Sequence, residues 1–131
     1  MRILVIEDNS DIAANLGDYL EDRGHTVDFA ADGVTGLHLA VVHEFDAIVL
    51  DLNLPGMDGF AVLAALKREP ALARVPILAV TALAMAGDRE KVLAAGFDGF
   101  LRKPVTGDLL VSAIAQAFAK RRATPDATIS P

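Results

Sequence analysis

Residues 47–59 read AIVLDLNLPGMDG, so a carboxylate directly follows a continuous apolar run. Residues 47–50 show no polar alternation, which predicts a strand that is buried on both faces of a sheet. Asp51 then lies where this strand ends. In an open parallel sheet, the carboxyl ends of the strands form the crevice where ligands bind. There Asp51 can act as a nucleophile, a metal ligand or a helix cap, and the surrounding residues decide between these roles.

The composition limits both the class of protein and its environment. A length of 131 residues fits one domain, and a hydrophobic share of 53% suits a sheet covered on both faces. The chain has no cysteine, which excludes disulfides and thiolate metal sites. Its net charge of -6 argues against a general nucleic-acid surface. No apolar run approaches the ~18 residues of a membrane span, and no signal peptide is evident, so we expect a cytoplasmic protein.

Strands and helices alternate along the whole chain. Apolar or alternating runs predict strands at residues 2–6, 26–30, 47–50, 75–80 and 98–102. Helical spacing predicts helices at residues 12–23, 33–41, 59–68, 84–95 and 107–118. We expect Val34, Leu37 and Val41 to form the buried face of the second helix. The last helix should bury a stripe formed by Leu109, Leu110, Ala113, Ile114, Ala117 and Phe118.

This alternation predicts a fold and its limits. Five strands that alternate with five helices indicate an α/β, doubly wound parallel sheet with right-handed crossovers. The flavodoxin-like strand order 2-1-3-4-5 places the alternating second strand on one edge and the short fifth strand on the other. The packed domain should cover residues 1–120. Residues 121–131 are polar and contain proline, which is typical of a flexible tail or the start of a linker.

Polar residues follow four of the predicted strands. Glu7 and Asp8 follow the first strand, Asp51 the third, Thr81 the fourth and Lys103 the fifth. In the expected order the first and third strands are neighbours, so three carboxylates share one corner. They would repel each other unless they were paired. A cluster of oxygen ligands suits a hard cation, and Mg²⁺ is the natural choice.

A metal beside a carboxylate, with a lysine and a threonine opposite, is an arrangement for phosphoryl transfer. The chemistry needs an in-line nucleophile and positive charge close to the phosphoryl oxygens. Asp51 would attack, while Lys103 and the metal neutralise two oxygens and the Thr81 hydroxyl binds a third. The product would be an aspartyl phosphate.

Four fragments together resemble a known family, the receiver domain of bacterial response regulators. They are IEDN at residues 6–9, LDLNLPGMDG at 50–59, VTA at 80–82 and FLRKP at 100–104. Each fragment alone is a weak signal, but all four occur in order and at the spacing of a receiver. The resemblance covers residues 1 to about 120. It implies that Asp51 is the phosphoacceptor and that a histidine kinase or a histidine phosphotransfer protein phosphorylates it.

The resemblance also implies roles for the surrounding residues. Glu7 and Asp8 resemble the acidic pair that holds Mg²⁺ together with Asp51, and Asn53 would contribute its backbone carbonyl. Lys103 would pair with the phosphoryl group. The family would then act as a signalling switch that catalyses its own aspartyl phosphorylation and dephosphorylation, and not as an enzyme with a separate substrate.

Further implied roles concern the switch itself. Thr81 would be the switch hydroxyl, and Phe100 the aromatic side chain that changes rotamer with it. The Lys103–Pro104 peptide bond would be cis. Asn53 and Leu83 would flank the path of the hydrolytic water. Because Leu83 is apolar and cannot orient that water, we expect slow self-dephosphorylation.

One departure from the family pattern bears on the output of such a switch. Receivers of transcription factors with a winged-helix output usually carry an acidic pair where this chain has Asp98 and Gly99. We therefore expect a single-domain regulator that contacts a downstream protein through residues 84–118, without direct nucleic-acid binding or membrane contact. The alternative is the receiver portion of a longer regulator, with a DNA-binding output or as part of a hybrid kinase.

Hypotheses from other classes remain. A Mg²⁺-dependent phosphohydrolase with Asp51 as nucleophile usually carries a second aspartate as general acid two residues later, but this chain has Asn53 there. A flavin-binding module would need a phosphate-cradling loop after the first strand, where Glu7 and Asp8 would repel a phosphate. A degenerate receiver that only docks partners would not need the intact acidic triad.

Overall fold

The computed structural model describes residues 1–82 and 88–123 of the chain. Its strands are β1 (Arg2–Ile6), β2 (Thr26–Ala30), β3 (Ala47–Asp51), β4 (Ile77–Thr81) and β5 (Gly99–Arg102). They form one sheet in the order β2-β1-β3-β4-β5, and every pairing is parallel. The expected doubly wound topology is confirmed.

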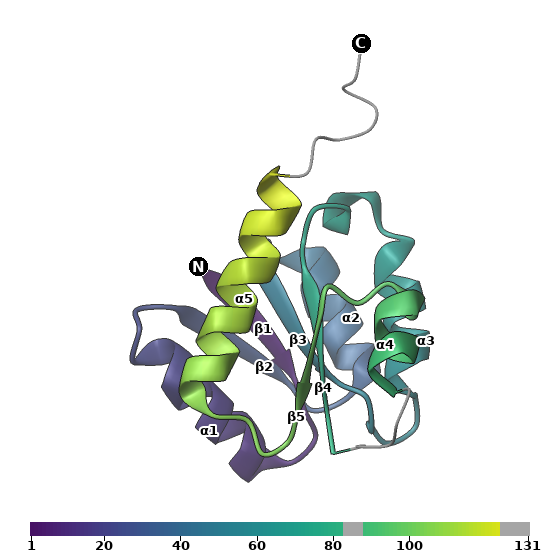
Figure 1. The fold of residues 1–131 in the computed structure, drawn as a ribbon. Coiled ribbons are helices and arrows are strands. Elements are labelled where there is room, and N and C mark those ends of the chain that lie inside the picture. Colours follow the sequence, from purple (N-terminus) through teal and green to yellow (C-terminus); the bar gives the residue numbers. More distant parts are fainter. Residues whose placement is uncertain (83–87, 124–131) are drawn as a thin grey trace.

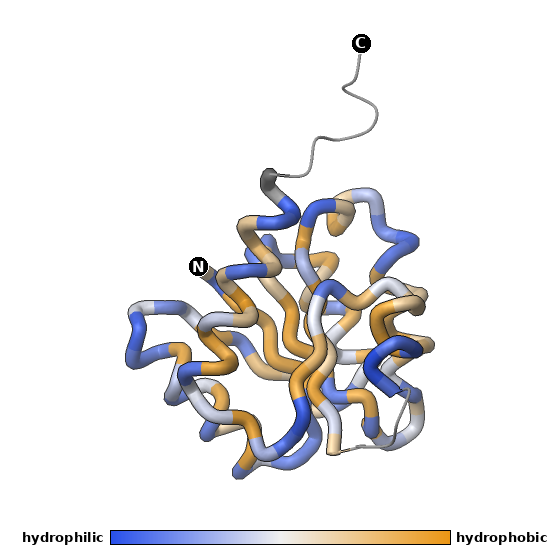
Figure 2. The backbone as a smooth tube through the Cα atoms, in the orientation of Figure 1, coloured by the Kyte–Doolittle hydropathy of each residue, from blue (hydrophilic) through white to orange (hydrophobic). Residues whose placement is uncertain are grey.

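Helices cover both faces of this sheet (Figure 1). They are α1 (Ser10–Glu21), α2 (Gly33–Val42), α3 (Gly59–Lys67), α4 (Asp88–Ala95) and α5 (Gly107–Ala123), with the short 3-10 helix η1 (Pro70–Leu72) before β4. α1 and α5 pack on one face, whereas α2, α3 and α4 pack on the other. Hydrophobic residues concentrate in the strands between these layers (Figure 2).

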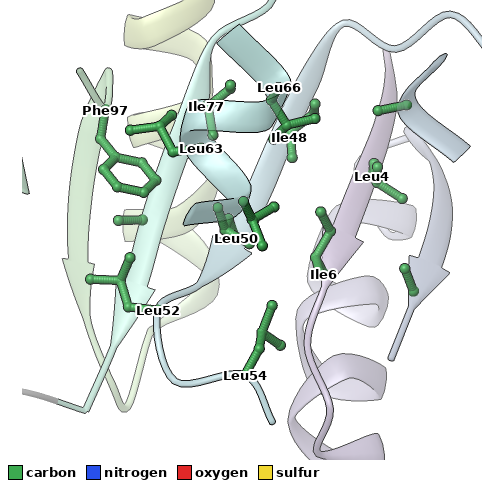
Figure 3. Packing of buried hydrophobic residues seen from close by; sticks show 14 of the residues in the cluster. Leu4, Ile6, Ile48, Leu50, Leu52, Leu54, Leu63, Leu66, Ile77 and Phe97 are labelled. Carbon is green, nitrogen blue, oxygen red and sulfur yellow. The ribbon is translucent and has the colours of Figure 1, made fainter. Parts of the chain in front are cut away.

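Two apolar cores result, one on each face of the sheet. On the first face, Leu50 of β3 packs among side chains of β1, α3 and β4 (Figure 3). On the second face, Val49 packs with Leu16 of α1 and Ile114 of α5. All five residues of β3 are buried. This burial explains why residues 47–50 lack polar alternation.

Side-chain caps stand at the starts of α1, α2 and α3, in the loops that follow β1, β2 and β3. The Asn9 side chain accepts hydrogen bonds from the Asp11 and Ile12 N–H groups at the start of α1. Asp32 and Asp58 begin α2 and α3 in the same way. Because these caps satisfy free N–H groups of the first turn, they fix where each helix leaves its loop.

The buried face of α2 differs from our expectation. Val34 and Val41 are 69% and 52% exposed, so their prediction as core residues was wrong. The helix instead buries Gly33, Gly36 and Ala40. A Cβ atom at Gly36 would lie 2.5 Å from Ile6 Cδ1, so the glycine allows α2 to approach β1 closely. Close packing, and not the spacing of large residues, therefore sets the rotation of this helix.

The last helix also departs from the expected pattern. Leu109 is 58% exposed, whereas Leu110, Ile114 and Ala117 are buried. α5 also extends to Ala123, past residue 120, where we expected the packed domain to end. Residues 124–131 of the expected tail lie outside the described residues, as do Leu83 and residues 84–87 of the expected fourth helix.

An ion pair holds the final turns of α5 against the sheet. Arg121 Nε donates to Asp98 Oδ1 at 2.8 Å, and Arg121 Nη1 donates to the Ala73 carbonyl at 3.3 Å. Asp98 Oδ2 in turn accepts the Ile77 N–H at 2.8 Å. One aspartate thus links the starts of β4 and β5 to α5.

Within the described residues, no helix is long and apolar enough to cross a membrane.

Substitutions in α2 test which of its faces is buried. We expect Val34→Thr to change the free energy of unfolding by less than about 0.5 kcal/mol, because the side chain is exposed. Gly36→Val should lower it by about 1–3 kcal/mol, because the added atoms collide with Ile6. Urea unfolding measures both values. An equal loss in the two variants would contradict this packing.

Candidate functional site

The predicted strand-end residues meet at one edge of the sheet. β1 and β3 are adjacent, and Ile6 pairs with Leu50, so Glu7 and Asp51 emerge side by side. Carboxylate oxygens of Glu7, Asp8 and Asp51 lie within 4.8 Å of one another. Glu7 and Asp51 are only 4% and 3% exposed, whereas Asp8 faces solvent. The sequence-based expectation of a three-carboxylate corner is therefore confirmed.

Lys103 faces this acidic cluster from the end of β5. Its Nζ lies 2.7 Å from Glu7 Oε1 and 3.3 Å from Asp51 Oδ2. The Lys103 N–H donates to the Thr81 carbonyl at 2.8 Å, which joins the ends of β4 and β5. The Lys103–Pro104 peptide bond is cis, as the resemblance implied.

The charges in this pocket change one another's protonation. Burial raises the pKa of Glu7, while Lys103 opposes the shift and Asp51 adds to it. Burial acts to lower the pKa of Lys103, but the nearby Glu7 and Asp51 carboxylates outweigh it, so this pKa is raised. Lys103 therefore stays charged, and a single ammonium faces three carboxylates.

The donor set fits a hard divalent cation. Glu7 Oε1 is buried and accepts no hydrogen bond of normal geometry among the described residues, although the Lys103 ammonium lies close to it. The cluster offers oxygen ligands only, and Asp8 leaves one side open to water. Such a mixture of carboxylates and accessible water positions is typical of Mg²⁺ sites.

Asn53 links Asp51 to Thr81. Its N–H donates to Asp51 Oδ1 at 3.0 Å, and its side-chain amide donates to Thr81 Oγ1 at 3.4 Å. The Thr81 side chain is fully buried. Sequence reasoning considered the Asn53 carbonyl and its position in the loop, but it missed this side-chain contact with Thr81.

Gly59 is a second residue whose role was missed. A Cβ atom at Gly59 would lie 2.6 Å from Leu52 Cα, and its N–H donates to the Leu52 carbonyl at 3.1 Å. The absent side chain therefore lets α3 begin against the residue that follows Asp51. Asp58-Gly59 belonged to the fragment at residues 50–59 that resembles a receiver, but nothing in that fragment indicated this close approach of backbones.

Phe100 and Thr81, the two residues expected to form the switch, line the same cavity. Both line a cavity of about 60 Å³, together with Leu52, Phe60 and Val92. Phe100 is partly buried in β5, and Phe60 stacks edge-on against Phe97 with 6.0 Å between the ring centres. The expected partner of Asn53 along the water path, Leu83, lies outside the described residues.

Comparison with known families agrees with this geometry. The family model described as "Response regulator receiver domain" matches residues 3–115. The chain belongs to this family. The match runs from β1 to about the middle of α5 and includes all the strand-end residues described above.

Two curated transcriptional regulators are also similar to this chain. The chain is 39% identical over 125 residues to the transcriptional regulatory protein TcrA of Mycobacterium tuberculosis. It is 43% identical over 104 residues to the transcriptional activator protein IrlR of Burkholderia pseudomallei. These matches cover 95% and 79% of this receiver, but only 48% and 44% of the relatives. The chain thus spans about half the length of these curated relatives.

Solved structures show the same fold. The receiver domain of sensor histidine kinase PA1611 from Pseudomonas aeruginosa superposes with a TM-score of 0.82 at 33% identity, over 90% of this chain and 97% of that one. That structure is described as having a magnesium ion coordinated in its active site cleft. A sensor protein from Polaromonas gives a TM-score of 0.84 at 30% identity, over 92% and 97% of the two chains.

The balance of charge in the pocket predicts a pH-dependent loss of stability. Without divalent metal at neutral pH, we expect Lys103→Met to lower the free energy of unfolding by about 2–4 kcal/mol, because buried carboxylates lose their counter-ion. Since the pKa of Glu7 is already raised, the folded variant binds more protons than the unfolded chain. Its stability therefore falls as the pH rises, and the loss should shrink between about pH 7 and about pH 5.

Urea unfolding at several pH values measures this effect. Lys67→Met, which removes an exposed lysine of α3, is the matched control and should show no such trend. A loss for Lys103→Met that does not depend on pH would contradict the electrostatic explanation.

Proposed function

We propose that this receiver accepts a phosphoryl group on Asp51 from a histidine kinase or a histidine phosphotransfer protein. The observation that carries the proposal is the buried Asp51 carboxylate, held 3.3 Å from the Lys103 ammonium beside Glu7 and Asp8. An Asp51 oxygen attacks phosphorus as the bond from phosphorus to the donor histidine nitrogen breaks, and the neutral imidazole leaves with the electron pair. The product is an aspartyl phosphate.

The surrounding residues hold and stabilise the group that is transferred. Glu7, Asp8, Asp51 and the backbone carbonyl of Asn53 would hold Mg²⁺, which when bound neutralises phosphoryl charge. The Lys103 ammonium pairs with a phosphoryl oxygen, and the Thr81 hydroxyl donates to another. The same residues catalyse self-phosphorylation from small donors and self-dephosphorylation. Because the group that is modified belongs to the protein itself, the protein acts as a switch and not as an enzyme with a separate substrate.

Phosphorylation then shifts the equilibrium between two conformations of Thr81, Phe100 and the α4–β5–α5 face. The added charge of about −1.5 to −2 draws the Thr81 hydroxyl toward Asp51. Thr81 and Phe100 line one cavity, so a movement of Thr81 changes the space available to the ring. The output surface is the α4–β5–α5 face, which carries a groove of about 440 Å³ lined by Leu93, Leu101 and Leu109, among others.

A downstream protein in the cytoplasm is the proposed partner of this face, with no direct nucleic-acid or membrane contact by these residues. The candidate that we favour is a regulator that acts through protein contact alone. The alternative is the receiver portion of a longer regulator, and the names and lengths of the curated relatives favour a DNA-binding output for that case.

The other function classes are less well supported. A phosphohydrolase would need a general acid where Asn53 lies, and an amide cannot serve as one. A flavin-binding module would place a phosphate where Glu7 and Asp8 form an acidic corner. A docking module without chemistry would not require Lys103 between two buried carboxylates.

Phosphate labelling tests the proposal directly. With acetyl phosphate and Mg²⁺, we expect intact mass to show a gain of one phosphoryl group in the wild type. Asp51→Asn should abolish this gain, because an amide is not a nucleophile here, and removing Mg²⁺ should abolish it in the wild type. Asp58→Asn, which keeps a capping side chain at α3, is the matched control and should still be labelled. Labelling of Asp51→Asn equal to the wild type would refute the assignment.

The lifetime of the phosphoryl group tests the role of Leu83 beside Asn53. We expect slow self-dephosphorylation, and Leu83→Gln or Leu83→Glu should accelerate it by about tenfold or more, because a polar side chain can orient the attacking water. The loss of label after removal of the donor measures this rate. An unchanged lifetime in both variants would refute the idea.

A further inference from the structure

The start of α5 meets α1 at a contact that the site described above does not use. Figure 1 shows the first turns of α5 beside α1. A Cβ atom at Gly107 would lie 2.7 Å from Tyr19 Cδ1 and 2.8 Å from Tyr19 Cγ. These atoms form the base of the ring, so a side chain at position 107 could be accommodated only if the whole ring moved. Gly107 has no positive φ, so the glycine is required by space and not by backbone conformation.

One ion pair, between two exposed side chains, crosses the same junction, and two local hydrogen bonds lie on either side of it. Arg23 Nη2 pairs with Asp108 Oδ1 at 2.7 Å, and Arg23 Nη1 donates to the Tyr19 carbonyl at 3.4 Å. Thr106 Oγ1 accepts the Leu109 N–H at 3.3 Å, which closes the first turn of α5. The first turn of α5 therefore has a defined position against α1.

Lys103 lies at the other end of the same short loop. Its N–H is bonded to Thr81 at the sheet, and Val105 packs against the core between α1 and α5. Only residues 104–106 separate Lys103 from Gly107. Because this segment has only three residues and Val105 packs against the core, we expect a displacement of the start of α5 to move Lys103 as well. The ammonium must stay within a few tenths of an ångström of its contacts to pair with a carboxylate or a phosphoryl oxygen.

We propose that Gly107 and Tyr19 are positioning residues for Lys103. The bare Cα of Gly107 lets α5 begin directly against the Tyr19 ring, and this approach sets the reach of the loop that carries the ammonium to Glu7 and Asp51. The inference rests on the proposed phosphoryl transfer to Asp51 and adds to it the residues that place its cation.

Initial labelling rates with acetyl phosphate and saturating Mg²⁺ test this role. We expect Gly107→Ala to slow labelling by about tenfold, because small misplacements of a catalytic group have large kinetic effects. Adding Tyr19→Ala to Gly107→Ala should restore the rate to that of Tyr19→Ala alone, because the collision is gone. Gly17→Ala is the matched control. It also places a Cβ against an aromatic ring, 2.4 Å from Phe29 Cζ, but away from the loop, so labelling should stay within about twofold.

A second comparison, in a background that lacks Lys103, separates a positioning role of Gly107 from a general structural defect. In a Lys103→Ala background, Gly107→Ala should change the residual rate by less than about twofold, because the residue through which it acts is gone. A purely structural defect would slow both backgrounds equally, and that result would overturn the inference. Equal rates for Gly107→Ala and wild type would also overturn it, while the proposed function would stand.

Two remaining outcomes are equally decisive. If the wild type is not labelled, both the proposed function and this inference fail. If Gly107→Ala alone does not fold, Tyr19→Ala decides the question, because it removes the surface against which α5 begins. The inference would be supported if folded Tyr19→Ala were labelled more slowly than the wild type and if Tyr19→Ala caused no further slowing in the Lys103→Ala background. Labelling of Tyr19→Ala at the wild-type rate would overturn it.

Discussion

The structure depends on holding two carboxylates, Glu7 and Asp51, together in a nearly dry pocket. Parallel pairing of Ile6 with Leu50 makes this proximity unavoidable, since each carboxylate is the next residue along its strand. Like charges so close and so poorly solvated repel strongly. Lys103 offsets only part of this repulsion, so the remainder must be balanced by apolar burial elsewhere. The acidic corner is thus a local instability that the rest of the fold supports.

That support comes from a sheet buried on both faces. Because β3 presents no residue to solvent, the strand that carries Asp51 is fixed by two cores at once. The loops are held just as closely: Gly59 seats the start of α3 against Leu52, and Asn53 bridges Asp51 and Thr81. The side chains of Asp51 and Thr81 therefore lie at the ends of strands that are held closely on both faces.

The fold and the strand-end residues could be predicted from the sequence because both are local signals. An apolar run marks each inner strand, and the polar residue that ends it marks the crevice. The face of α2 could not be predicted, because this helix is apolar on nearly every side and its spacing fits more than one face. Contact between Gly36 and Ile6 decided the outcome, and Val34 was left in solvent. The pairing of Arg121 with Asp98 joins residues 23 positions apart and has no local pattern.

The junction between α1 and α5 has an optical consequence. Tyr19 is the only tyrosine in the chain, and there is no tryptophan. The intrinsic fluorescence of the protein therefore arises almost entirely from a ring that rests against the first residue of α5. The molecule thus carries a built-in reporter beside Gly107, at the end of the loop that follows Lys103. Emission from this single ring reads out that junction without any added label.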